Sequence, residues 1–271
     1  MTETTLPPLL LVGCGKMGGA MLSGWLEQGL REAVVVEPYA PAAAAFAGRV
    51  TVVPDAASIP AGFTPGAVVL AIKPQEAAAT LPHFARFAGP GTLFVSIMAG
   101  RNVAGMRALL GEHAAVVRAM PNTPAAVRQG YTCCHASAGV TPAQQALADT
   151  LLSAVGLVDW VEDEALIDPV TAVSGGGPAY VFLLAELLEA AAIEQGLPPE
   201  LARRMARTTV AGSGALLAAS TEESAQLRKN VTSPKGTTER ARNVLMAPDA
   251  WPKLISEAMA AATARSRELA G

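Results

Sequence analysis

The first 160 positions of the chain alternate short, unbroken apolar runs with stretches in which apolar residues recur at helical spacing. The runs are rich in valine and do not alternate with polar residues, which is typical of parallel strands buried on both faces. They lie at 9–13, 33–37, 50–53, 67–72, 92–97 and 114–120, and helices are expected at 17–28, 41–47, 75–87 and 102–110. Two further short strands are predicted near 131–135 and 157–161, with a helix at 142–154 between them. The pattern predicts an α/β domain with a doubly wound, mostly parallel sheet.

The second part of the chain has helical spacing and no strand signal. Residues 178–196 are apolar on nearly all sides, so this helix must be buried in a core or in a subunit interface. Further helices are predicted at 198–219, 222–229, 238–246 and 249–269. Because the period changes near 160–165 without a flexible linker, we expect two domains, 1–162 and 163–271, and the second is all helical.

Composition argues against several classes of protein. The net charge of −3 gives no reason to expect a nucleic acid or an anionic membrane as a partner. Three cysteines, two of them adjacent, make a poor disulfide framework, so we expect reduced thiols in a cytoplasmic protein. The three histidines lack the spacing of metal ligands, so no metal site is expected. No signal peptide is visible, and the uncharged run at 169–185 is broken by glycines and a proline, so no membrane span is expected.

A glycine pattern follows the first predicted strand and opens the first predicted helix. Gly13, Gly15 and Gly18 form G-x-G-x-x-G, which in this context indicates a dinucleotide-binding loop. The first glycine permits a tight turn, the second permits close approach of a pyrophosphate, and the third permits close packing of helix on strand. Free N–H groups at the helix N-terminus would bind the phosphates. The alternative is a glycine turn that is needed only for packing.

Two charged residues stand at the carboxyl ends of predicted strands, where ligands bind in such sheets. Glu37 is placed to accept hydrogen bonds from ribose hydroxyls, and it favours NAD(H) over NADP(H) because its charge would repel a 2′-phosphate. Lys73 is expected to contact the cofactor. A solvated side chain is the alternative for either residue, and a catalytic acid is a further alternative for the lysine. The predicted cofactor-binding set in this half is Gly13, Cys14, Gly15, Lys16, Met17, Gly18, Glu37, Ala71, Lys73 and Pro74.

Two further polar segments have competing interpretations. The loop at 121–124 places Asn122 and Thr123 near where a nicotinamide would lie, but it is equally well an Asn–Pro turn. The segment SGGGPAY at 174–180 is better explained by close packing of helices than by a site.

The segment NVTSPKGTTERA at 230–241 has two interpretations as well. Pro234 stops one helix, and another begins near Thr237. The free N–H groups at the start of this helix can be capped by nearby hydroxyls. The same groups could bind a small anion such as a carboxylate. The chain needs a substrate to pair with the dinucleotide, which supports the second interpretation.

Five motifs, VGCGKMG, AIKPQ, MPNTPAAVRQG, SGGGPAY and NVTSPKGTT, occur in the order and at about the spacing seen in pyrroline-5-carboxylate reductase. The chain resembles this family over almost its whole length. The resemblance implies a Rossmann-type domain followed by an all-α dimerisation domain, NAD or NADP as cofactor, and dimers that assemble further, often into decamers. It implies hydride transfer to (S)-1-pyrroline-5-carboxylate, which gives L-proline in the last step of proline biosynthesis, at a site completed by the partner subunit.

The resemblance also assigns residue roles. It implies that the substrate carboxylate is bound by the Ser233 hydroxyl and by the N–H groups of Gly236 and Thr237. Thr238 is the expected catalytic residue, because it would hydrogen-bond the ring nitrogen, and Asn230 is expected to contact the cofactor ribose.

Three positions depart from the pattern of the family. Lys235 replaces a usual glycine, Gly176 replaces a serine found in many members, and Met98 stands where a small residue is commoner.

The residues alone leave two other functions open: another NAD(P)-dependent imine or 3-hydroxyacid oxidoreductase, or a non-enzymatic dinucleotide-binding protein. Oxidoreductases of the first kind usually use a lysine in the helical domain as the acid. The nearest candidates for that role here, Lys229 and Lys235, lie outside any long predicted helix.

Overall fold

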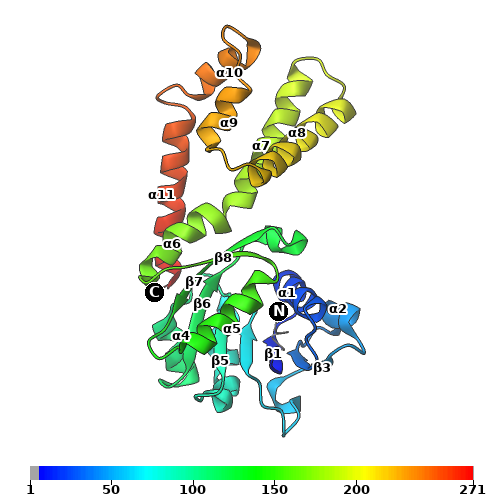
Figure 1. Cartoon of the computed structure of the whole chain (residues 1–271), viewed down its shortest axis with the longest axis vertical. Coiled ribbons are helices and arrows are strands. Elements are labelled where there is room, and N and C mark those ends of the chain that lie inside the picture. The colour runs from blue at the N-terminus through cyan, green and yellow to red at the C-terminus, as the bar shows by residue number, and fades with distance from the viewer. Residues whose placement is uncertain (1–5, 271) are drawn as a thin grey trace. The chain divides into compact units, whose positions relative to one another are not determined.

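The computed structural model describes residues 6–270 and contains an eight-stranded sheet (Figure 1). The strand order is β3-β2-β1-β4-β5-β6-β7-β8, and neighbouring strands are parallel except for β6 and β7. All the predicted strands are confirmed. They are β1 (Leu9–Val12), β2 (Ala33–Val36), β3 (Thr51–Val53), β4 (Ala67–Leu70), β5 (Leu93–Ser96), β6 (Ala115–Met120), β7 (Gly130–Ala136) and β8 (Gly156–Trp160).

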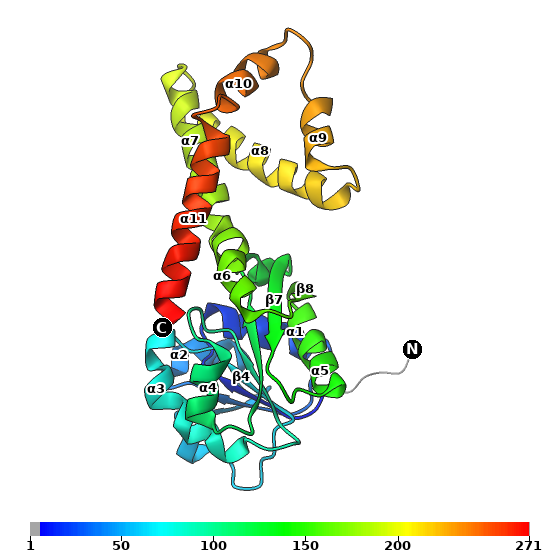
Figure 2. The ribbon, with the colours of Figure 1, turned by 90° about the vertical axis from the view of Figure 1, so that its left-hand side faces the viewer.

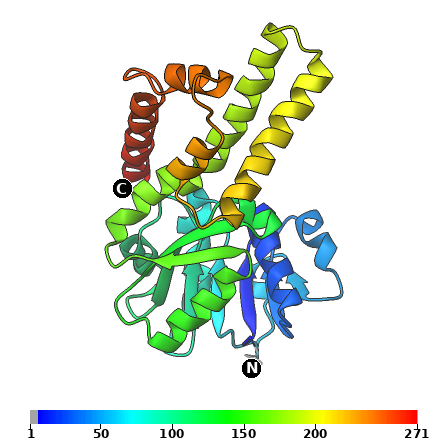
Figure 3. The ribbon, with the colours of Figure 1, turned by 45° about the horizontal axis from the view of Figure 1, so that its top comes forward.

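Both faces of the sheet are buried, which explains why its strands have unbroken apolar sequences. In β1, Leu9 and Leu11 belong to the core on one face, and Leu10 and Val12 belong to the core on the other. Helices α1 and α5 contribute to the first core, while α3 and α4 contribute to the second (Figure 3). The helices of this part are α1 (Lys16–Glu27), α2 (Ala40–Ala43), α3 (Ala77–Thr80), α4 (Val103–Leu110) and α5 (Pro142–Ser153).

Two of the predicted helices are only partly α-helical. The segment predicted at 41–47 is α2 followed by a 3₁₀ turn, Ala44–Phe46. The segment predicted at 75–87 contains α3 and a longer 3₁₀ stretch, Leu81–Phe87. Pro82 lies at the start of this stretch, and a proline cannot donate the backbone hydrogen bond that would continue the preceding α-helix.

The described chain forms two compact units. The first contains the sheet and ends at Gly175, but it also includes the chain from Ala262 onward, and the second is Gly176–Ala261. In the second unit α7 and α8 pack side by side, and α9 and α10 are short helices joined by a loop (Figure 2). The remaining helices are α6 (Ile167–Val170), α7 (Gly177–Glu194), α8 (Pro199–Ala219), α9 (Ser224–Asn230), α10 (Thr237–Leu245) and α11 (Trp251–Ala270).

The long apolar helix α7 packs on α8 but is only partly covered by its own chain. It has no buried residue, and the side chain of Phe182 is 62% exposed. Burial in a core of the single chain, one of the two expectations for this helix, is therefore wrong, and burial in a subunit interface is left. By length and composition alone, the helical stretch Glu164–Glu194 could also cross a membrane, but the core helix of a soluble protein passes the same test of length and composition.

Candidate functional site

The glycine loop lies where strand order reverses. β1 and β4 are neighbours in the sheet, although β2 and β3 come between them in the chain, and ligands bind beyond the carboxyl ends of strands at such a point. Gly13 has φ +92°, and a Cβ on it would lie 2.6 Å from the Ala71 carbonyl oxygen. A Cβ on Gly18 would overlap the carbonyl oxygen of Gly13. Both positions therefore require glycine because the backbones are in direct contact.

The start of α1 is open to a ligand. Gly15 is the residue before the helix, and within residues 6–270 no side chain caps it. A Cβ on Gly15 would meet no atom within 4 Å, so packing does not explain this glycine. The exposed N–H groups and the positive end of the helix dipole fit the pyrophosphate of a dinucleotide.

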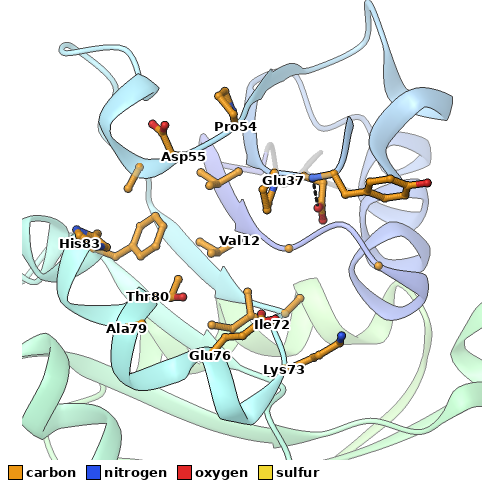
Figure 4. A pocket seen from close by; sticks show the side chains of 18 residues that line it. Val12, Glu37, Pro54, Asp55, Ile72, Lys73, Glu76, Ala79, Thr80 and His83 are labelled. Carbon is orange, nitrogen blue, oxygen red and sulfur yellow. Dashed lines mark hydrogen bonds between the residues drawn. The ribbon is translucent and has the colours of Figure 1, made fainter. Parts of the chain in front are cut away.

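Glu37 binds the glycine loop directly. One carboxylate oxygen accepts the N–H of Cys14 at 2.7 Å. The other accepts the N–H of Tyr39 at 2.9 Å, the bond that is drawn beside Glu37 in Figure 4. The carboxylate thus holds the end of β2 against the turn after β1. It lies at the edge of the sheet where the sequence predicts a contact with ribose.

A cavity of about 560 Å³ lies beside the glycine loop. Five of the predicted cofactor residues line it: Gly13, Gly15, Glu37, Ala71 and Lys73. The other predicted residues of this half are close in sequence but do not line it: Cys14 and Gly18 are buried, Met17 and Pro74 are half-buried, and Lys16 is exposed. The volume and the open glycine turn fit the adenosine half of a dinucleotide.

The cavity has a further end that sequence reasoning missed. Asp55 and His83 lie at this end, and Lys73 lies on the opposite side, as Figure 4 shows. Asp55 follows β3 and accepts hydrogen bonds from the N–H and hydroxyl of Ser58 at 2.9 and 2.8 Å. These bonds lower the pKa of the Asp55 carboxyl. The rule that ligands bind beyond strand ends could have identified Asp55, but no sequence signal marks His83, which is brought in by the 3₁₀ stretch.

The segment before α10 is a tight turn in the second unit. The N–H of Gly236 donates to the Ser233 carbonyl at 3.0 Å, and Lys235 has a positive φ of 60°. The N–H of Lys235 donates to the Glu239 carboxylate at 2.8 Å. Within residues 6–270 no side chain caps α10, so the expectation of a hydroxyl cap is wrong. Instead, the Glu239 carboxylate, in the first turn of α10, accepts a backbone hydrogen bond from the preceding loop and stabilises it.

The remaining predicted positions have local hydrogen-bond partners. The side-chain amide of Asn230, at the end of α9, donates to Glu222 at 3.1 Å, and its oxygen accepts from Gln226 at 2.7 Å. This residue and the turn at 233–238 belong to the second unit, whereas the cavity belongs to the first. In the first unit, the Asn122 amide donates to the Ser174 carbonyl at 3.2 Å, and its oxygen accepts the N–H of Tyr131 at 2.8 Å.

The three cysteines are buried and not joined by disulfides. Burial, together with the smaller effect of the nearby charge of Glu37, raises the pKa of the Cys14 thiol to about 11. Burial also raises the pKa of Cys133 and of Cys134. The thiols are therefore protonated at neutral pH and are poor nucleophiles. Among the described residues, no group of three or more His, Cys, Asp or Glu side chains could hold a metal ion.

Known proteins resemble the chain along its full length. The family model "Pyrroline-5-carboxylate reductase dimerisation" matches residues 164–269, and "NADP oxidoreductase coenzyme F420-dependent" matches residues 9–100. A pyrroline-5-carboxylate reductase of Pseudomonas aeruginosa is 41% identical over 97% of each chain. A solved structure of the Coxiella burnetii enzyme of that name has a TM-score of 0.90 and 32% identity, and covers 98% of this chain and 100% of that one. The Plasmodium falciparum pyrroline carboxylate reductase, solved with NADP bound, has a TM-score of 0.82 and 25% identity over 98% of each chain.

The packing of the glycine loop predicts opposite effects for two neighbouring substitutions. Gly18→Ala should destabilise the protein by about 1–3 kcal/mol, because the new Cβ overlaps the Gly13 carbonyl. Gly19→Ala is the matched control in the same helix, since its Cβ would lie 3.7 Å from the Phe46 ring, an ordinary contact. It should be neutral or stabilising by up to about 1 kcal/mol. Urea unfolding of both variants measures the difference, and equal stabilities would contradict the packing.

The burial of the thiols predicts their reactivity. At pH 8 the native protein should react with 5,5′-dithiobis(2-nitrobenzoic acid) far more slowly than the unfolded protein, because a raised pKa leaves little thiolate at that pH. After unfolding in guanidinium, all three thiols should react. Rapid reaction of a thiol in the native protein would show that it is accessible and ionised.

Proposed function

The chain belongs to the pyrroline-5-carboxylate reductase family, and from this premise we infer that it reduces (S)-1-pyrroline-5-carboxylate to L-proline with NAD(P)H, the last step of proline biosynthesis. One observation carries the inference. The identity of 41% is measured over 97% of both chains, so the aligned stretch spans both the glycine loop and the turn before α10. The protein is thus an oxidoreductase that acts on a carbon–nitrogen double bond.

The reaction adds a hydride to the C=N carbon and a proton to the ring nitrogen. The reduced nicotinamide, when bound, supplies the hydride. The imine nitrogen can take its proton from solvent before the substrate binds, so the protein needs no strong acid at this point. This agrees with the absence of His and Cys from residues 230–241. Catalysis then consists mainly of holding the substrate in a reactive orientation.

We assign the substrate to the turn before α10. The Ser233 hydroxyl and the N–H groups of Gly236 and Thr237 would bind the carboxylate, which the positive end of the helix dipole favours. The Gly236 N–H already serves the turn through its bond to Ser233, so it would be shared with the ligand. The Thr238 hydroxyl, one residue further, would orient the ring nitrogen and stabilise the amine product.

Position 235 has a positive φ, which suits the glycine that is usual in the family at this position. The turn needs a left-handed residue between Pro234 and Gly236, a conformation that glycine adopts without strain. Lysine adopts it here, and the Glu239 carboxylate bonds its N–H. Lysine thus takes a conformation here that glycine adopts without strain.

The cofactor would be held by the glycine loop and the adjacent cavity. The N–H groups at the start of α1 would bind the pyrophosphate, and Glu37 would accept hydrogen bonds from the ribose. Cys14, Lys16, Met17 and Gly18 complete the loop, while Ala71, Lys73 and Pro74 follow β4 on the other side. Asn230 would contact the ribose from the helical part of the chain.

Electrostatics of the cavity favour NADH over NADPH. Glu37, Asp55 and Glu76 line it with carboxylates, and Lys73 is its one lysine among the residues that the structure describes. A 2′-phosphate at the edge next to Glu37 would add negative charge beside a carboxylate, which disfavours binding.

We also propose how the chain is organised and assembled. Residues 1–162 bind the dinucleotide, and 163–271 form the dimerisation and substrate-binding domain. Large exposed apolar side chains gather on the helices of the second part, and the matched dimerisation model covers 164–269. Their burial in a homodimer offers a source of stability, and dimers could assemble further into a decamer. The uncharged apolar surface is then an interface rather than a membrane span, in a cytoplasmic enzyme without a nucleic-acid partner.

The role of the substrate turn predicts the effect of Thr238→Ala. The variant should lower kcat/KM for pyrroline-5-carboxylate by about tenfold to hundredfold, because it removes the hydroxyl that orients the ring nitrogen. The Kd for NADH should stay within about twofold of wild type, measured by fluorescence titration. Thr237→Ala is the matched control: it keeps the backbone N–H and should change kcat/KM little. Equal effects of the two variants would remove the proposed role of Thr238.

The charge of Glu37 predicts the cofactor preference. The ratio of kcat/KM with NADH to that with NADPH should exceed one in wild type and should fall about tenfold in Glu37→Gln, since the amide does not repel the 2′-phosphate. Glu76→Gln, another carboxylate of the cavity, serves as the control and should change the ratio less. A wild-type preference for NADPH would overturn the assignment.

A further inference from the structure

A buried arginine lies on the sheet outside the cofactor cavity. Arg118, in β6, is 3% exposed and lies between Ser96 of β5 and His135 of β7. It shares a sheet face with Val116, which belongs to the core beneath α3 and α4. A buried charge is costly unless it is paired, so the Arg118 guanidinium requires oppositely charged partners at this position.

The partners of Arg118 come from the segment that leads out of the sheet unit. Its guanidinium lies 3.0 Å from the Glu164 carboxylate and 3.8 Å from the Asp168 carboxylate. The same Glu164 oxygen accepts the N–H of Val103, the first residue of α4, at 2.8 Å. One carboxylate thus ties the arginine to the start of a neighbouring helix.

A third element joins the cluster from the end of the chain. The Ser266 hydroxyl, in α11, donates to the Asp168 carboxylate at 2.8 Å, and both residues are buried. Leu269 lies against Gly100, where an added Cβ would be 3.0 Å from the Leu269 Cβ. The last turns of α11 are therefore fixed to the sheet unit next to α6 (Figure 1).

The next residue on this face of β6, Met120, and the loop that follows the strand extend this attachment. Met120 packs on Gly175, where an added Cβ would lie 2.6 Å from the methionine methyl group. Two residues further, Asn122 bonds the Ser174 carbonyl. Residues 118, 120 and 122 thus hold the outgoing segment at successive points up to Gly175, where the first compact unit ends.

We propose that Arg118, Glu164, Asp168 and Ser266 form a clasp that positions the helical part of the chain for catalysis. The chain leaves the sheet unit after Gly175 and returns at Ala262. Asp168 lies shortly before the exit and Ser266 shortly after the return, so one ion cluster anchors both crossings. Arg118 is a positioning residue, because it fixes the segments by which the chain leaves and re-enters the sheet unit and does not contact the substrate. This role rests on the proposed function, because it matters only if the turn before α10 carries the substrate.

The test compares two neighbouring residues of α11. Ser266→Ala removes the hydroxyl that bonds Asp168, while Arg265→Ala removes an exposed ion pair with Glu268 and leaves the clasp intact. Amide hydrogen exchange in 262–269 should be about tenfold faster in Ser266→Ala and unchanged in Arg265→Ala, because a buried hydrogen bond to a charged group is lost only in the former, whereas the Arg265–Glu268 pair is exposed. Exchange in β1 should match wild type in both.

Kinetics separate positioning from a purely structural role. Ser266→Ala should lower kcat/KM for pyrroline-5-carboxylate several-fold, because orientation is lost, while its Kd for NADH stays within about twofold of wild type. Asp168→Asn, which keeps an acceptor for Ser266 but removes the charge facing Arg118, should lower kcat/KM in the same way. Equal exchange in the two alanine variants, or unchanged kcat/KM in both Ser266→Ala and Asp168→Asn, would overturn the proposal. If wild type reduces no pyrroline-5-carboxylate, the proposed function fails, whereas the exchange comparison still tests the clasp.

Discussion

The direct contact between the backbone of the glycine loop and the end of β4 is the constraint on which the cofactor site depends. Only glycine fits at positions 13 and 18, since a Cβ at either would meet a carbonyl oxygen. This contact lets the chain turn sharply from β1 into α1 and leaves the helix start uncapped at the point where strand order reverses. The cavity, the position of Glu37 and the dipole available to a phosphate all follow from it.

The helical part of the chain is governed by a different constraint, which is apolar surface that the single chain cannot bury. α7 has no buried residue, although its sequence is apolar on nearly all sides. Exposure of such a surface to water is unfavourable, so the stability of the helical part depends on a partner that covers it. The sheet unit instead holds two apolar cores of its own, on either face. The chain therefore combines one part with a complete core and one part that association would complete.

Sequence patterns predicted the features that are determined by residues close together in the sequence. The valine runs indicated the strands because both faces of the sheet are buried, and the glycine pattern located the loop because Gly13 and Gly18 each meet a local backbone requirement. The patterns missed what depends on distant contacts. His83 reaches the cavity through an irregular 3₁₀ stretch, and Asp168 of α6 contacts Ser266 of α11 only after four intervening α-helices, α7 to α10. The bond from Lys235 to Glu239 was also missed, because a left-handed lysine is rare and hydroxyls are the commoner caps.

The proposed function requires that a hydride passes from the nicotinamide directly to the C=N carbon of pyrroline-5-carboxylate. The most direct measurement uses NADH carrying deuterium at both C4 positions and follows the product by mass spectrometry. Direct transfer gives L-proline with a single deuterium at C5 when the reaction is run in ordinary water, and the label does not depend on the substrate concentration. Proline without deuterium at C5, or oxidation of NADH without formation of proline, would contradict it.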